Sequence, residues 1–238
     1  MILHIPHSGT EIGNIPVKDS DILRGTDWYV DQLFSHQDAD VLVQPYSRFI
    51  CDCERLPDEV EPLYNSGYGI TYKKDFDGNP FNDYDEMLSK SIYTEHHKVL
   101  NSMTRKQLCY IPVVYIVDCH SFSNEQLESD VDFCIGFNDD FTDFDMLQEI
   151  VDYLKKCGYK VGINEPYSNA IVPSDYINNP EVKSIMIEIN KRLYLKEGTN
   201  IKSDNFNIVE KDINNVLTII SKQEEKYDDF QILLTRSI

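Results

Sequence analysis

The stretch VVYIVDCHS, residues 113–121, decides the fold class of this chain. Its first five residues are apolar on both faces and mostly β-branched, as in the central strand of a parallel sheet. Segments with strand-like and helix-like patterns alternate on both sides of it, in the order typical of α/β proteins. We therefore expect an α/β fold: a single three-layer domain with a mixed, mostly parallel sheet and helices on both faces.

The neighbouring segments give the order of the elements. Strands are expected at residues 2–5, 41–43, 48–51, 131–137, 160–163 and 184–189, and helices at residues 27–35, 84–108, 146–156 and 205–221. Residues 57–81 are rich in proline, glycine and tyrosine, and long irregular segments of this kind often form active-site loops or lids. No linker divides the chain, so we expect one domain over residues 1–238. Residues 223–238 form its charged tail, and their apolar residues 232–234 are expected to dock on the domain.

The charge of the chain limits the classes of partner. It holds 41 acidic and 22 basic residues, a formal net charge of −19. Such a surface repels phosphate backbones and anionic lipids, which argues against nucleic-acid and membrane partners and favours a small-molecule substrate. An anionic substrate would then need a locally positive pocket, supplied by a metal ion or by particular arginines.

The cysteines and the N-terminus indicate an intracellular protein. The six cysteines are few for the length and most lie in apolar runs, as is typical of reduced core thiols. The spacing of Cys51-Asp52-Cys53 does not suit a structural zinc site, and no CxxC partner is present. The N-terminus has no secretion signal and no apolar stretch approaches membrane-spanning length, so we expect a cytoplasmic protein. Nothing in the sequence indicates its oligomeric state.

Three residues that could bind a metal or move a proton lie at strand ends. His7 follows the first strand, His120 follows the central strand, and Glu188 lies at the end of a late strand. Open α/β sheets bind ligands at the carboxyl ends of their strands. Alone, each residue would be an ordinary hydrogen-bonded histidine or exposed carboxylate. Two histidines and a carboxylate with an open position, however, are the ligand set of hydrolytic zinc sites.

A further glutamate beside such a site would complete the chemistry of amide hydrolysis. Zinc lowers the pKa of a water toward ~7 and polarises the carbonyl, and a carboxylate takes the water proton and passes it to the leaving nitrogen. Asp118 lies two residues before His120 and therefore on the same side of its strand. There it could fix the imidazole tautomer, or be a plain strand-end carboxylate.

These residues lie in motifs that resemble those of the N-formylglutamate amidohydrolase family. The motifs follow the family's order from residue 2 to about residue 195, and the two histidine motifs with Glu-Ile-Asn are the most specific. They are PHSG (residues 6–9), TDWYVD (26–31), DCHS (118–121), DFCIG (132–136), and IEIN (187–190) with Leu193-Tyr194. The resemblance implies a zinc carboxypeptidase-like α/β fold and makes residues 1–238 a single catalytic domain.

Carried over to this chain, the resemblance makes His7 and His120 metal ligands and Glu188 the general base, with about one zinc per chain. The resemblance does not determine which residue is the third metal ligand. The His-x-x-Glu pair of zinc carboxypeptidases is absent, because the residue three after His7 is Thr10. Asp27 opens a helix in a family motif and is our choice, although a helix N-cap would explain it as well. Glu11 and Asp31 are alternatives.

The resemblance also proposes substrate-binding residues. Arg55 matches the arginine of a family Asn-Arg element that would bind the substrate carboxylate, which arginine does best by bidentate pairing. Glu54 replaces the asparagine, and its negative charge would weaken an anionic ligand. Arg48 and Arg192 are alternative clamps, with a solvated surface position as the ordinary explanation of each.

Three further features bear on the substrate. His97 aligns with a family Tyr-His element, with packing as its structural alternative, and Asn190 belongs to the Glu-Ile-Asn motif; both are substrate-binding candidates. Residues 164–167 resemble a family substrate loop, but the glycine expected after Tyr167 is missing.

The sequence therefore predicts a zinc-dependent amidohydrolase that cleaves an N-acyl amino acid, with N-formyl-L-glutamate, cleaved to formate and L-glutamate, as one candidate. A related metallo-carboxypeptidase or amidase acting on a peptide or another acylated amine is the first alternative. A catalytically silent metal- or ligand-binding domain is the second. No Gly-x-Ser-x-Gly elbow, Walker loop or Gly-x-Gly-x-x-Gly is present, which disfavours serine hydrolases and nucleotide-binding enzymes.

Overall fold

The computed structural model describes residues 1–123 and 130–235, with side chains described up to residue 227. Six strands form one sheet in the order β2-β1-β3-β6-β4-β5. Neighbouring strands are parallel except β4 and β6, which are antiparallel, so the predicted mixed, mostly parallel sheet is confirmed. The strands are β1 (Ile2–Ile5), β2 (Asp40–Val43), β3 (Val114–Phe122), β4 (Phe133–Gly136), β5 (Val161–Ile163) and β6 (Val182–Asn190).

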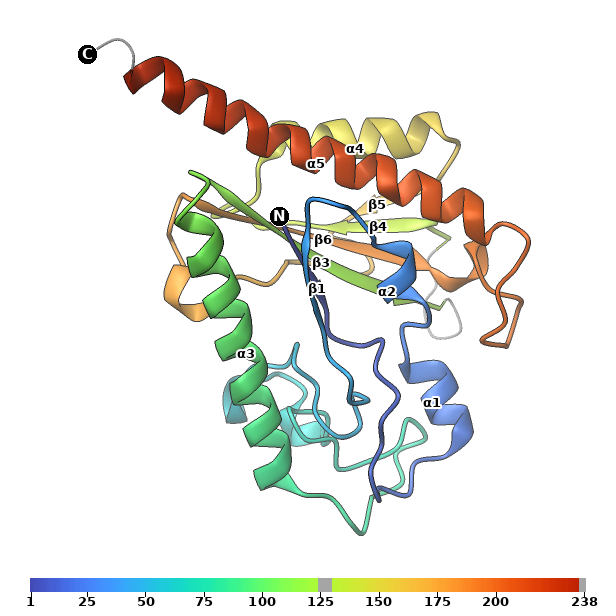
Figure 1. Cartoon of the computed structure of the whole chain (residues 1–238). Coiled ribbons are helices and arrows are strands. Elements are labelled where there is room, and N and C mark those ends of the chain that lie inside the picture. The colour runs from blue at the N-terminus through green and yellow to red at the C-terminus, as the bar shows by residue number, and fades with distance from the viewer. Residues whose placement is uncertain (124–129, 236–238) are drawn as a thin grey trace.

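Helices cover both faces of the sheet, as Figure 1 shows. The long helices α4 and α5 lie together on one face, and α3 lies on the opposite face. The predicted three-layer α/β arrangement is confirmed. The helices are α1 (Asp19–Gly25), α2 (Val30–Leu33), α3 (Glu86–Leu108), α4 (Phe144–Lys156) and α5 (Phe206–Thr235), with 3-10 turns at η1 (Asp58–Val60), η2 (Tyr64–Ser66), η4 (Ser174–Tyr176) and η5 (Lys191–Leu193). No described helix is long and apolar enough to cross a bilayer.

The central strand β3 sets which side chains face the functional site. Its residues are buried along the whole strand, and Tyr115 and Val117 pack into the core cluster shared with α4 and α5. Val114 and Ile116 pack instead against α3. Because side chains alternate across a strand, the polar residues that follow, at positions 118 and 120, lie on the α3 face.

The chain reverses its direction of winding at the end of β1. The strands β2 and β3 lie on either side of β1. The connection from β1 to β2 includes α2, which packs on α5, whereas the connection from β2 to β3 runs through α3 on the opposite face. The carboxyl end of β1 is therefore a topological switch point, where open α/β sheets bind ligands.

Four predicted elements differ from the structure. Residues 48–51 form a turn, in which two amides bond the carbonyl of Ser47, and not a strand. The helix expected at residues 27–35 shrinks to α2, and α1 was not expected. The helix predicted at residues 84–108 begins at Glu86, where Met87 is 83% exposed, and Leu100 is buried.

The fourth difference is at the C-terminal helix. α5 continues to Thr235, past the predicted end at residue 221. An ion pair between the Met1 amine and Glu224, 2.8 Å long, ties this extension to the start of β1. The predicted docking of residues 232–234 falls outside the described side chains.

Candidate metal centre

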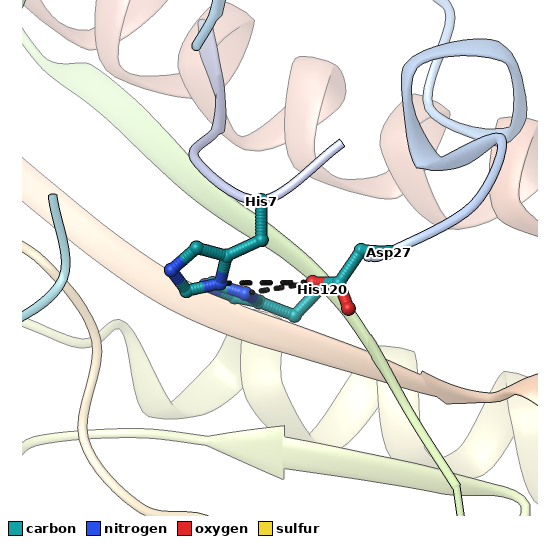
Figure 2. Close-up of side chains that lie close together, drawn as sticks. All are labelled: His7, Asp27 and His120. Atoms are coloured by element: carbon teal, nitrogen blue, oxygen red, sulfur yellow. Dashed lines mark hydrogen bonds and ion pairs between the residues drawn. The ribbon is translucent and has the colours of Figure 1, made fainter. Parts of the chain in front are cut away.

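His7, Asp27 and His120 converge on one point at the carboxyl end of β1 (Figure 2). Oδ2 of Asp27 lies 3.3 Å from Nδ1 of His120 and 3.8 Å from Nδ1 of His7. One ligand atom from each residue lies within 4.8 Å of the other two, and all three side chains are buried. A single cation could contact these three atoms together.

The loop after β1 holds His7 in place. The carbonyl of His7 accepts a hydrogen bond from the amide of Asp27 (2.9 Å), and the Ser8 hydroxyl bonds the Asp27 carbonyl (3.0 Å). Gly9 passes so close to the backbone that a β carbon there would lie 2.4 Å from the Gln44 carbonyl oxygen. Only glycine fits this approach, which explains the last residue of the PHSG motif.

A carboxylate lies behind each of the two histidines. Nε2 of His7 lies 2.8 Å from Oδ1 of Asp52, and Nε2 of His120 lies 3.0 Å from Oδ1 of Asp118. Carboxylates in this position fix the tautomer and the ring orientation of metal-binding histidines. Both Nδ1 atoms are thereby turned toward Asp27. Nδ1 of His7 is buried and has no hydrogen-bond partner among the described residues, so the donor set fits a divalent cation.

The protonation of His7 and Asp27 suits metal binding. Burial and the nearby positive charge of Arg48 lower the pKa of His7 to about 4, which keeps the ring neutral. Burial alone would raise the pKa of Asp27, but the hydrogen bond with His120 and the charge of Lys191 lower it, so the side chain is a carboxylate. A neutral imidazole and a carboxylate are the forms that bind metals.

His120 carries more positive character than His7. Burial opposes its charged form, but the negative charges of Asp118 and Asp27 outweigh burial and raise its pKa well above the usual value. A cation at the site would therefore displace the proton on Nδ1.

Glu188 is the direct neighbour of His120 in the sheet, since the two residues are partners in the parallel register of β3 and β6. Its side chain is buried, and Oε2 has no hydrogen-bond partner among the described residues. Burial, with the negative charge of Asp27, raises the pKa of Glu188 to about 7 against the opposing effect of His120. A carboxyl group of this kind can both accept and return a proton near neutral pH.

A cavity of about 610 Å³ opens over these groups. Its walls combine the ligand candidates, Glu188, several cations and the loop around Tyr167. From the loop around Tyr167, the lining residues are Pro166, Tyr167 and Ser168. The cationic lining residues are Arg24, Arg48, Arg55 and Lys191. Nε of Arg48 is buried without a hydrogen-bond partner among the described residues.

The structure brings Asp27, and not its two alternatives, to the histidines. Glu11 and Asp31 are exposed, and neither lines the cavity. Asp27 does not cap α2 either, because Tyr29 occupies the N-cap position with a left-handed backbone. The side chain of Asp27 is directed instead at His120 and His7.

The predicted substrate-binding residues are spread more widely. Arg55 lines the cavity, but its Nε lies 3.3 Å from Asp52. His97 bonds the Cys53 carbonyl (2.9 Å) and does not line the cavity. Asn190 bonds the Val131 carbonyl and borders a neighbouring cavity.

Arg192 is likewise outside the site. It pairs with Asp130 and Asp132 at the surface and lines the same neighbouring cavity as Asn190. The substrate-binding roles of His97 and Asn190 stay predictions without a place in the metal cavity.

Asp52 is the member of the site that sequence reasoning missed. It is fully buried and also accepts a hydrogen bond from the Tyr72 hydroxyl (2.8 Å). The sequence showed it only as the middle of Cys51-Asp52-Cys53, in a segment expected to follow a strand directly. Its place three residues before Arg55 was the one signal available.

Comparisons with known proteins identify the family and the fold of the chain. The family model for N-formylglutamate amidohydrolase matches residues 1–195. The crystal structure of N-formylglutamate amidohydrolase from Ralstonia eutropha JMP134 superposes with a TM-score of 0.81 at 20% identity, covering 94% of each chain. A gene product of Agrobacterium tumefaciens superposes with a TM-score of 0.64 at 20% identity, covering 92% of this chain and 91% of that one. No curated protein sequence matches the chain. The family match over most of its length shows that the chain belongs to the N-formylglutamate amidohydrolase family.

Proposed function

We propose that this protein is a zinc-dependent hydrolase of N-acyl amino acids, with N-formyl-L-glutamate as the first candidate substrate and formate and L-glutamate as products. The observation that carries the proposal is the convergence of His7, Asp27 and His120 beside Glu188 in one cavity. Membership of the family supports hydrolysis of a linear amide.

His7 Nδ1, Asp27 Oδ2 and His120 Nδ1 would hold the cation. When bound, zinc supplies a Lewis acid for the acyl carbonyl and lowers the pKa of a water toward ~7. Asp52 and Asp118 keep the two imidazole rings oriented and make the ring nitrogens more basic. The protein contributes a preorganised site, since all five side chains are buried.

Glu188 would move the protons of the reaction. Its carboxylate would take a proton from the attacking water and then give it to the leaving amine, so that the amide bond breaks as the product amine forms. The register places it beside His120, and its unpartnered Oε2 is available for this exchange. With a pKa near 7, neither transfer is strongly uphill.

Arg48 and Arg55 would receive the negative charge of the substrate. Nε of both arginines lacks a hydrogen-bond partner among the described residues, but Arg55 already forms an ion pair with Asp52 and donates a hydrogen bond to the Tyr72 hydroxyl. We therefore assign the stronger interaction with an anionic substrate group to Arg48, and the carboxylate pairing implied for Arg55 becomes secondary.

A catalytically silent binding domain would require Asp27 or Glu188 to be directed away from the histidines. Both are buried beside them, which favours the enzyme over that alternative. An amidase or carboxypeptidase for another acylated amine or a peptide is distinguished by substrate rather than by the catalytic groups.

The test is hydrolysis of a small panel of N-formyl and N-acetyl amino acids and a dipeptide by zinc-loaded protein. We expect formate release from N-formyl-L-glutamate, loss of that activity after chelation, and its return with zinc. Turnover of the dipeptide alone would support the carboxypeptidase alternative. No turnover of any substrate by zinc-loaded protein would contradict the proposed reaction.

A further inference from the structure

A second group of metal-binding side chains lies next to the first. One ligand atom each of His4, Glu54 and Asp118 lies within 4.8 Å of the other two. The His4 nitrogen is 2.8 Å from Asp118 and 3.2 Å from Glu54. Like His120, His4 and Asp118 lie on the α3 face of the sheet, where neighbouring strands bring them together.

The group is incompletely satisfied without a ligand. Oε1 of Glu54 is buried and makes no hydrogen bond with any described residue, although His4 is near it. Two carboxylates therefore face a single imidazole nitrogen, and Asp118 is already the closer partner of that nitrogen. The charged form of a buried carboxyl group with an unpartnered oxygen is unfavourable, and a cation would stabilise it.

The ring of His4 is held as a ligand would be. Its second nitrogen, Nε2, lies 2.7 Å from Nε2 of His96, and Nδ1 of His96 lies 3.4 Å from the amide nitrogen of Gln44. This arrangement fixes the orientation of His4 from behind, as Asp52 does for His7. Because Glu54 lines the main cavity, a cation could enter from there.

We propose that His4, Glu54 and Asp118 form a second divalent-cation site, separate from the His7–Asp27–His120 site and joined to it through Asp118. One imidazole and two carboxylates suit Zn²⁺ or Mn²⁺. Asp118 contacts both His4 and His120, so it links the two sites.

The second site gives Glu54 a reason to occupy this cavity. The resemblance to the family places an asparagine at this position, and a bare carboxylate would repel an anionic substrate. A cation held by Glu54 and Asp118 would cancel their charge. The proposal concerns cation binding and does not depend on the proposed reaction.

Calorimetric titration of the metal-free full-length chain with Zn²⁺ tests the proposal. We expect two binding steps in the wild-type protein, the second weaker. Glu54→Gln preserves the shape of the side chain and removes its charge, so we expect the second step to weaken ~10-fold or more while the first step remains. Glu54→Asn should behave in the same way. Glu197→Gln, at a glutamate bordering a different cavity, is the matched control and should bind as wild type.

Cys53→Ser tests whether the nearby thiols hold the second cation, because Cys53 precedes Glu54 in the chain and its Sγ lies 3.7 Å from Sγ of Cys51. A single step in the wild-type protein, or an unchanged second step in Glu54→Gln, would overturn the second site. The second site would also be overturned if Cys53→Ser lost the second binding step while Glu54→Gln kept it. Loss of substrate hydrolysis with both steps intact would count against the proposed function and leave the second site standing.

Discussion

Asp52 and His7 are 45 residues apart in sequence, yet Oδ1 of the buried aspartate lies 2.8 Å from Nε2 of the histidine. Tyr72 and Arg55 hold the other carboxylate oxygen, so Asp52 cannot turn away. The contact fixes which nitrogen of His7 faces the metal site. Asp52 would thus orient His7, the first of the proposed ligands, without contacting the cation itself.

Asp52→Asn should weaken zinc binding about 10- to 100-fold, because a neutral amide makes the imidazole less basic and permits the wrong tautomer. Competition with a chromophoric chelator measures the affinity. Asp58→Asn, at an exposed aspartate paired with Lys90, is the matched control and should bind zinc as wild type. Equal affinity in the two variants would show that Asp52 does not position His7.

Glu188→Gln should keep the metal and lower kcat by ~10²-fold or more, because the amide can no longer accept the proton of the attacking water. Zinc content and steady-state kinetics on the best substrate give the two readings. Glu181→Gln, at an exposed glutamate that precedes the same strand, should leave both unchanged. A fully active Glu188→Gln enzyme would rule out the general-base role.

Arg48→Ala should lower kcat/KM for an anionic substrate about 10- to 100-fold, which corresponds to the roughly 1.5–3 kcal/mol of a hydrogen bond to a charged group. The same variant should have a smaller effect on an uncharged N-formyl amide. Arg105→Ala, at an exposed arginine in α3, serves as the control. A loss of equal size for charged and neutral substrates would contradict the proposed anion contact.

Met146→Ala should lower the free energy of unfolding by about 2–5 kcal/mol, because its side chain is fully buried in the core between α4 and the sheet. Met87→Ala removes the same atoms from a side chain that is 83% exposed, and a change within about 0.5 kcal/mol is expected. Urea denaturation followed by far-UV circular dichroism measures both. Similar losses in the two variants would contradict the core described for α4.

The parts of the fold that sequence predicted are those with strong hydrophobic patterns. The central strand is buried on both faces and has no polar residue before Asp118, so its position could be predicted from the sequence. The turn at residues 48–51 could not be predicted from the sequence, because its apolar residues are buried by tertiary contacts and match the pattern of a strand equally well. The long-range ion pair of Met1 with Glu224 likewise leaves no local signal for the continuation of α5.

Only the part of the candidate site that lies at strand ends could be predicted from the sequence. His7 and His120 stand out because a histidine directly follows or ends an apolar strand. Asp27 was indicated only by the family resemblance, and its choice over a helix cap needed the observed position of Tyr29. The partnership of His120 with Glu188 depends on the register between β3 and β6, which a single sequence does not specify.

The central claim is that His7, Asp27 and His120 bind one cation together. Anomalous diffraction from crystals of the zinc-loaded protein, collected on both sides of the zinc absorption edge, tests it most directly. We expect a peak within coordination distance, about 2.0–2.2 Å, of Nδ1 of both histidines and a carboxylate oxygen of Asp27. A zinc-loaded crystal with no peak among these three side chains would contradict it.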